Sequence, residues 1–79
     1  MKITILAFGI AKDIMGKTIT NVETSEHTVH ELREQLLATY PGFKKLTSLR
    51  LAVNEEYRAD DFQLSDGDEV AIIPPVSGG

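Results

Sequence analysis

The chain has 79 residues with 42% apolar residues, enough for one small globular domain and too apolar for a disordered one. Its net charge of −4 argues against nucleic acid or an anionic membrane as the main partner. The sequence has no cysteine, which excludes a disulfide framework, a thiolate zinc site and a cysteine nucleophile.

The first expected element is a strand over residues 2–8, because one alternating set (Ile3, Ile5, Ala7) and its complement (Thr4, Leu6, Phe8) would lie on opposite faces. The apolar run at 3–10 is too short to cross a membrane and lacks a convincing cleavage site, so we expect a soluble cytoplasmic protein. Gly16 marks a turn, and the β-branched, alternating residues 17–23 predict a second strand, paired with the first as a hairpin.

A helix is predicted to begin after Thr28. Thr28 and Glu31 fit the capping box, in which the first residue caps the helix and the second reaches back to it. The residues that follow form one apolar stripe at helical spacing: Val29, Leu32, Leu36 and Tyr40. Pro41-Gly42 should end the helix.

The last third of the chain predicts strands again. Residues 49–54 alternate, with Leu49, Leu51 and Val53 inward, and are followed by a turn at 54–56 and a short edge strand near 57–59. We expect Leu64 to fill the core beneath a loop, and residues 65–68 to form a tight turn in which Gly67 takes the positive φ. Residues 69–73 form the last strand, which Pro74-Pro75 ends because proline cannot continue a ladder.

This order predicts an α+β fold in which one main helix crosses one face of a mixed sheet of four to five strands. The first and last strands would lie parallel at the centre, which is the β-grasp, or ubiquitin-like, arrangement. We assign residues 1–73 to the β-grasp domain and residues 74–79 to an extended C-terminal tail. The tail ends in Gly78-Gly79.

The sheet face away from the helix is predicted to be apolar, although a face that only meets water should be polar. It would present Leu6, Phe8, Ala52, Ala71 and Ile73. Loops could cover these side chains. The alternative is that this face, close to where the tail leaves the domain, binds a partner protein.

Few residues suggest a site within the domain. His27 and His30 have no Cys or further His to complete a metal site, and the acidic residues at 60–61 and 66–69 lack the spacing of a calcium loop. A phosphate-binding loop, a dinucleotide fingerprint and a nucleophile–base pair are all missing. We therefore expect no metal and no cofactor on this chain alone, and a stand-alone enzyme is the weaker hypothesis.

The terminal diglycine predicts a reactive end. Glycine has no Cβ, so the Gly79 carboxylate would be unhindered and Gly78 would form a slim spacer that can enter a narrow slot. Residues 74–79 could reach about 20 Å if extended, and Pro74-Pro75 would stiffen the base of the tail. A frayed or truncated end is the alternative interpretation.

The chain closely resembles the small-subunit family of molybdopterin synthase along essentially its whole length. The most specific part is the ending from Leu64 to Gly79, LSDGDEVAIIPPVSGG; residues 8–16, 28–36 and 51–54 also match. The chain departs from that family at Gly9 and Lys12, where Ala and Arg are common, and at Ala7 and Ile73, where bulkier aromatics often occur.

The resemblance implies a β-grasp sulfur carrier, a non-catalytic subunit whose catalytic residues are on the large subunit. A ubiquitin-activating-like adenylyltransferase would use ATP to adenylate Gly79, which then becomes a thiocarboxylate. The tail would enter the large subunit, in an assembly expected to be a heterotetramer. The part that enters would include Pro74, Pro75, Val76, Ser77 and Gly78. There it would donate sulfur to cyclic pyranopterin monophosphate.

Three alternatives remain open. A related carrier for thiamine or tRNA thiolation would use the same terminal chemistry. A ubiquitin-like modifier would be conjugated to lysines through the same diglycine. A plain interaction module would have an incidental tail. The length and the Pro-Pro-Val-Ser that precedes Gly78 favour the synthase subunit.

Overall fold

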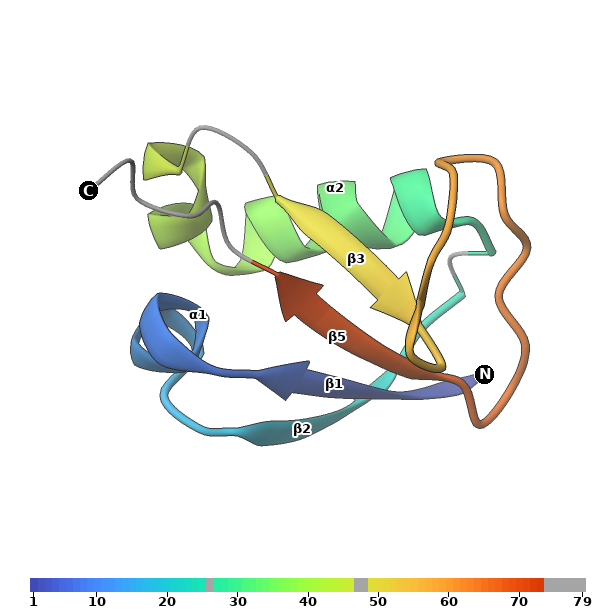
Figure 1. Ribbon diagram of the computed structural model, residues 1–79, viewed down its shortest axis with the longest axis horizontal. Helices are drawn as coiled ribbons and strands as arrows, with labels where there is room; N and C mark the ends of the chain where they lie inside the picture. Colours follow the sequence, from blue (N-terminus) through green and yellow to red (C-terminus); the bar gives the residue numbers. More distant parts are fainter. Residues whose placement is uncertain (26, 47–48, 74–79) are drawn as a thin grey trace.

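The computed structural model describes residues 1–25, 27–46 and 49–73. Their strands form one five-stranded mixed sheet in the order β2-β1-β5-β3-β4 (Figure 1). The strands are β1 (Lys2–Ala7), β2 (Ile19–Glu23), β3 (Arg50–Val53), β4 (Glu56–Tyr57) and β5 (Glu69–Ile73). The tail at 74–79 lies outside the described residues.

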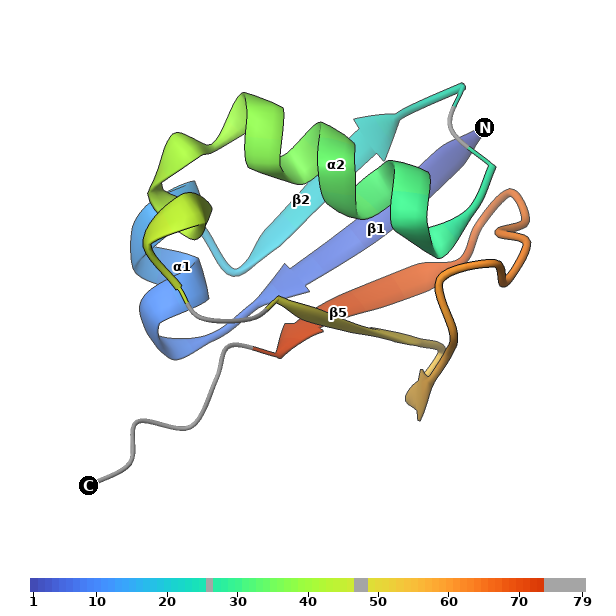
Figure 2. The ribbon, with the colours of Figure 1, turned by 90° about the horizontal axis from the view of Figure 1, so that it is seen from above.

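The helices lie on one side of the sheet. They are α1 (Gly9–Met15), α2 (Val29–Thr39) and a short 3₁₀ helix, η1 (Pro41–Lys45). Figure 2 shows α2 crossing one face, with α1 at the end of the sheet where β1 ends. The opposite face has no helix over it within the described residues (Figure 2).

The first and last strands are parallel neighbours at the centre of the sheet, as predicted. Ile5 of β1 pairs with Val70 of β5, while β2 and β3 flank this pair in antiparallel orientation. The β-grasp prediction is therefore confirmed. The edge strand β4 covers residues 56–57, slightly earlier than the predicted 57–59.

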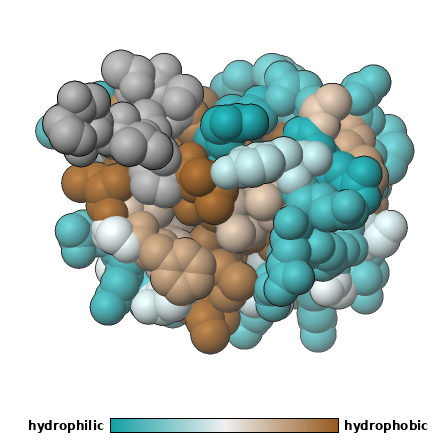
Figure 3. Space-filling view, viewed as in Figure 1, coloured by the Kyte–Doolittle hydropathy of each residue, from teal (hydrophilic) through white to brown (hydrophobic). Residues whose placement is uncertain are grey.

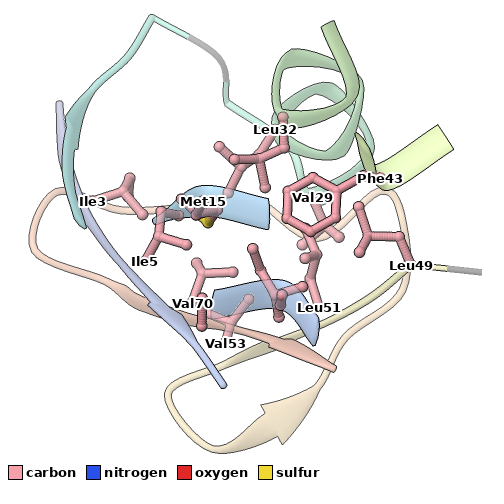
Figure 4. Close-up of a cluster of buried hydrophobic side chains, with 14 of the residues drawn as sticks. Ile3, Ile5, Met15, Val29, Leu32, Phe43, Leu49, Leu51, Val53 and Val70 are labelled. Atoms are coloured by element: carbon pink, nitrogen blue, oxygen red, sulfur yellow. The ribbon is translucent and has the colours of Figure 1, made fainter. Parts of the chain in front are cut away.

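The core lies between the sheet and the helices (Figure 4). Its members alternate along the strands and recur at helical spacing along α2, as the sequence pattern predicts. The largest fully buried side chains are those of Ile3, Ile5, Val29, Leu32, Phe43, Leu51, Val53, Val70 and Ile72. Leu64 is also buried, as expected for a residue beneath the long loop.

The start of α2 has the predicted capping box. The Thr28 hydroxyl accepts a hydrogen bond from the Glu31 backbone N–H at 3.1 Å, and the Glu31 carboxylate accepts one from the Thr28 N–H at 3.0 Å. The helix ends at Thr39. Pro41 then begins η1, so the predicted stop is correct and a 3₁₀ turn follows it.

The predicted main helix is α2, but the connection between β1 and β2 needs one correction, because it contains a second, short helix, α1. This segment was expected to be a simple hairpin connection with a turn at Gly16. Instead Ala11 and Met15, four residues apart, are buried on one helix face, and Gly16 ends α1 in the left-handed conformation at φ 87°. The second strand accordingly begins at Ile19 rather than at residue 17.

Candidate functional site

A row of apolar residues crosses the helix-free face of the sheet. The register places one residue from each strand side by side. Along the strand order the row is Ile19, Leu6, Ala71, Ala52 and Tyr57. Ile19 and Tyr57, at the two ends, are each 56% exposed. We call this row, together with Phe8 and Ile73, the outer apolar patch.

Two residues before Leu6 in β1 and Ala71 in β5, the same face of the sheet is polar. Thr4 Oγ1 donates to Asn21 Oδ1 at 3.2 Å. Asn54 accepts a hydrogen bond from the Glu69 N–H through Oδ1 at 3.0 Å. Hydrophobic side chains therefore gather toward the end of the face where β1 and β5 finish, and hydrophilic ones lie toward the other end (Figure 3).

Phe8 and Ile73 mark the edge of the patch nearest the tail. Ala7 and Ile72 are paired, so the residues that follow them, Phe8 and Ile73, lie at the same end of the sheet. Phe8 is 53% exposed and Ile73 is half-buried. The structure thus brings together Phe8, Ile73 and half-buried Leu6 of the predicted partner-binding set. The other members, Pro74, Pro75, Val76 and Ser77, lie outside the described residues, as do the predicted spacer Gly78 and the predicted reactive residue Gly79.

Sequence reasoning missed four exposed residues around this patch. Ile10 is 48% exposed in α1, and Ile19 and Tyr57 end the apolar row. The Arg50 guanidinium lies 4.3 Å from the centre of the Tyr57 ring, a cation–π contact. The alternation of residues 17–23 could have placed Ile19 on this face. The contact of Tyr57 with Arg50 could not be predicted in this way, because it depends on the pairing of β3 with β4.

Comparison with known proteins decides the family. The ThiS family model matches residues 5–79. The chain belongs to the ThiS family. This ThiS-family chain is 37% identical over 83 residues to the molybdopterin synthase sulfur carrier subunit of Caenorhabditis elegans, covering 100% of this chain and 99% of the relative.

Solved structures agree with the fold of this ThiS-family chain. A putative molybdopterin converting factor subunit 1 from Pyrococcus furiosus has a TM-score of 0.86 at 27% identity, over 96% of this chain and 99% of that one. A complex of subunits 1 and 2 of the molybdopterin-converting factor from Helicobacter pylori matches at a TM-score of 0.70 and 27% identity, covering 100% of both chains. In the H. pylori protein, a chain of this fold is bound to a second subunit.

Several described titratable groups of the ThiS-family chain form ion pairs at the surface. His30 lies 3.7 Å from Asp60 and 3.9 Å from Glu34, all three more than half exposed, and Arg33 bonds to Asp60 at 2.7 Å. The described residues contain no group of three or more His, Asp or Glu that could hold a metal ion. No described helix is long and apolar enough to span a membrane.

One carboxyl group has a shifted pKa, and its cause is structural. The backbone N–H of His27 donates to Glu31, and with the Thr28 hydroxyl it lowers the pKa of the Glu31 carboxyl. The shift therefore reflects the cap of α2. Within the described residues, the outer apolar patch beside the tail is the strongest candidate site.

Proposed function

We propose that this chain is the sulfur carrier subunit of a molybdopterin synthase. The observation that supports this most directly is similarity over the whole chain to subunits so named, including the family match that extends through Gly79. The fold supports the proposal because it ends β5 at an exposed apolar patch, from which a tail could reach into a partner.

The proposed chemistry is located at the Gly79 carboxylate. A carboxylate is a poor electrophile because its oxygen is a poor leaving group. The carboxylate attacks the α-phosphate of ATP on an activating enzyme, so that pyrophosphate leaves and an acyl adenylate forms. A sulfur nucleophile at the sulfide level (HS⁻) then attacks the carbonyl carbon and AMP leaves, giving a thiocarboxylic acid that loses its proton to become a thiocarboxylate. Because the chain has no cysteine, this carbonyl is where the transferable sulfur would be carried.

Two protein partners follow from this chemistry. A ubiquitin-activating-like adenylyltransferase would form the adenylate. A large synthase subunit would receive the tail, hold cyclic pyranopterin monophosphate and supply the catalytic residues, in a heterotetramer. The complex of the H. pylori relative supports a partner of this second kind. We place the outer apolar patch, with Phe8 and Ile73, against the large subunit.

A carrier for thiamine or tRNA thiolation would share the terminal chemistry, as would a ubiquitin-like protein modifier. The names of the full-length relatives favour the synthase subunit over these alternatives. The pathways differ in which acceptor takes the sulfur. An experiment must therefore follow both the formation of the thiocarboxylate and its consumption.

The test uses intact-protein mass spectrometry after incubation with the activating enzyme, ATP and a sulfur donor. We expect a gain of about 16 mass units at Gly79, from replacement of oxygen by sulfur, and its loss on adding the large subunit and the pterin precursor. Deleting Gly79 should leave thermal unfolding unchanged and abolish dithiolene formation. If the truncated chain still supports dithiolene formation, the proposal is wrong.

A further inference from the structure

The charges of this acidic protein are segregated along the sheet. Among the described residues, five of the eight basic side chains lie at the end where β1 and β5 finish, where the tail begins: Lys12, Lys17, Lys44, Lys45 and Arg50. We call these five the basic collar. Asp13 is the one acidic residue placed among them in the described chain.

The opposite end of the sheet is acidic. Glu69 begins β5, Glu23 ends β2, and Glu55 lies in the turn between β3 and β4. The loop that leads into β5 adds further carboxylates: Asp60, Asp61, Asp66 and Asp68. The two ends are separated by the five residues of β5, about 17 Å at roughly 3.4 Å per residue. This exceeds the screening length of about 8 Å at physiological ionic strength, so a partner surface meets each end separately.

Packing holds the members of the collar together. η1, which carries Lys44 and Lys45, packs on α1 so closely that a Cβ at Gly42 would lie 3.1 Å from Ile14 Cγ2. Lys12 lies in the last turn of α1 and Lys17 follows it. Figure 1 shows α1 and η1 side by side at the end of the sheet, and Figure 2 agrees.

Arg50 joins the collar to the base of the tail. Its backbone pairs with Ile73, the last described residue before the tail, and its guanidinium is held over the Tyr57 ring. All five collar side chains are exposed, and none has an ion-pair partner among the described residues. Their charges are therefore available to a partner.

We infer that the basic collar docks on an acidic protein surface that surrounds the opening through which the large subunit admits the tail. This inference rests on the proposed function. A slot that receives a carboxylate or thiocarboxylate must itself attract a negatively charged group, so the slot is not acidic. The slot binds the end of the tail, up to about 20 Å from the collar, so the rim and the slot can carry opposite charge.

Segregated charge also orients the encounter. An acidic rim attracts the collar and repels the acidic end of the sheet, so the tail would meet the partner first. Steering of this kind raises association rates by about ten- to a thousandfold and weakens steeply with salt. The outer apolar patch, next to the collar, then sets the rate at which the complex dissociates.

The test measures association kinetics of the full chain with its large subunit by stopped flow, at low salt and at about 0.5 M salt. Lys44→Glu and Lys45→Glu are the collar variants. Lys2→Glu is the matched control, because it makes the same charge change on an exposed residue at the acidic end. Thermal unfolding of each variant checks the fold.

At low salt we expect each collar variant to reduce the on-rate about three- to tenfold, with less than a twofold change in off-rate. The control should stay within about twofold, and high salt should remove the difference. On-rates of the collar variants equal to that of Lys2→Glu would overturn the collar while leaving the proposed function standing. Failure of the wild-type chain to bind the large subunit would overturn both.

Discussion

Leu6 of β1 and Ala71 of β5 are paired in parallel register at the centre of the sheet, and both face away from the helices. Their inward neighbours, Ile5 and Val70, are fully buried. Near the end where they finish, the two central strands are therefore apolar on both faces, as expected for strands covered on both sides. Only one side is covered within the described chain, which points to a partner on the other.

Phe8→Asp should weaken binding to the large subunit by about tenfold or more, because it puts a charge into an apolar contact. The fold should survive. Phe8 is the N-cap of α1 and its side chain makes no capping bond, whereas Asp is a favoured N-cap residue. Calorimetric titration gives the affinity and thermal melting gives the stability.

Asn21→Asp is the matched control for this prediction. It adds the same charge on the same face, at the polar end beside Thr4, and keeps the oxygen that accepts the Thr4 hydroxyl bond. Its affinity should stay within about twofold of wild type. Ile73→Asp, at the other edge of the patch, should behave like Phe8→Asp. Unchanged affinity for both patch variants would remove the outer apolar patch from the interface.

The parts of the fold that follow from local periodicity could be predicted from the sequence. The alternation of β1, β3 and β5 gave their inward faces correctly, and the capping box located the start of α2. α1 was missed because a seven-residue helix contains only two turns, and just two of its side chains, Ala11 and Met15, are buried. Its apolar Ile10 instead points to solvent, which hides the helical period.

The candidate site could be predicted only where it follows from a single strand. Leu6 and Ile73 were identified because alternation places them opposite the core. The contact between Arg50 and Tyr57 and the gathering of lysines beside the tail depend on which strands and helices become neighbours. Such long-range pairings are not encoded in any local pattern.

Gly42 and Ile14 should be energetically coupled. Gly→Ala at a compatible backbone position usually stabilises a protein by about 0.4–1 kcal/mol, but a Cβ at Gly42 would crowd Ile14 Cγ2 at 3.1 Å. Gly42→Ala should therefore gain nothing, or lose stability, in the wild-type chain. In an Ile14→Ala background, the same change should stabilise the protein.

Urea unfolding of the four proteins in this double-mutant cycle measures the coupling between Gly42 and Ile14, which should exceed about 0.5 kcal/mol. An equal effect of Gly42→Ala in the two backgrounds would show that η1 and α1 do not press on each other at this point.

The capping carboxylate of Glu31 predicts a pH dependence of stability. Hydrogen bonding from the His27 N–H lowers the pKa of Glu31 in the folded protein below its ordinary 4.5. The unfolded chain then binds more protons than the folded one as the pH falls. The stabilisation is therefore complete above about pH 5 and is lost as the pH drops through the folded pKa.

Glu31→Gln should lower the melting temperature at neutral pH, and its difference from wild type should shrink below about pH 4. Scanning calorimetry from pH 7 to about pH 3 follows this difference. Glu34→Gln serves as the control, because it removes the same charge from α2 outside the capping box. A constant gap between Glu31→Gln and wild type across the whole range would contradict the assignment.

Arg33 should stabilise the domain mainly through its bond to a backbone carbonyl. Its Nε–H donates to the Leu49 oxygen at 2.9 Å, while Nη1 pairs with Asp60 at 2.7 Å. Arg33→Met keeps the apolar stem but leaves that carbonyl without this donor, so we expect a loss of about 1–2 kcal/mol in urea unfolding. Asp60→Asn removes only the charge of a carboxylate that is 60% exposed, and such ion pairs contribute about 0.2–1 kcal/mol. Equal losses for the two variants would show instead that the ion pair, rather than the bond to Leu49, carries the effect.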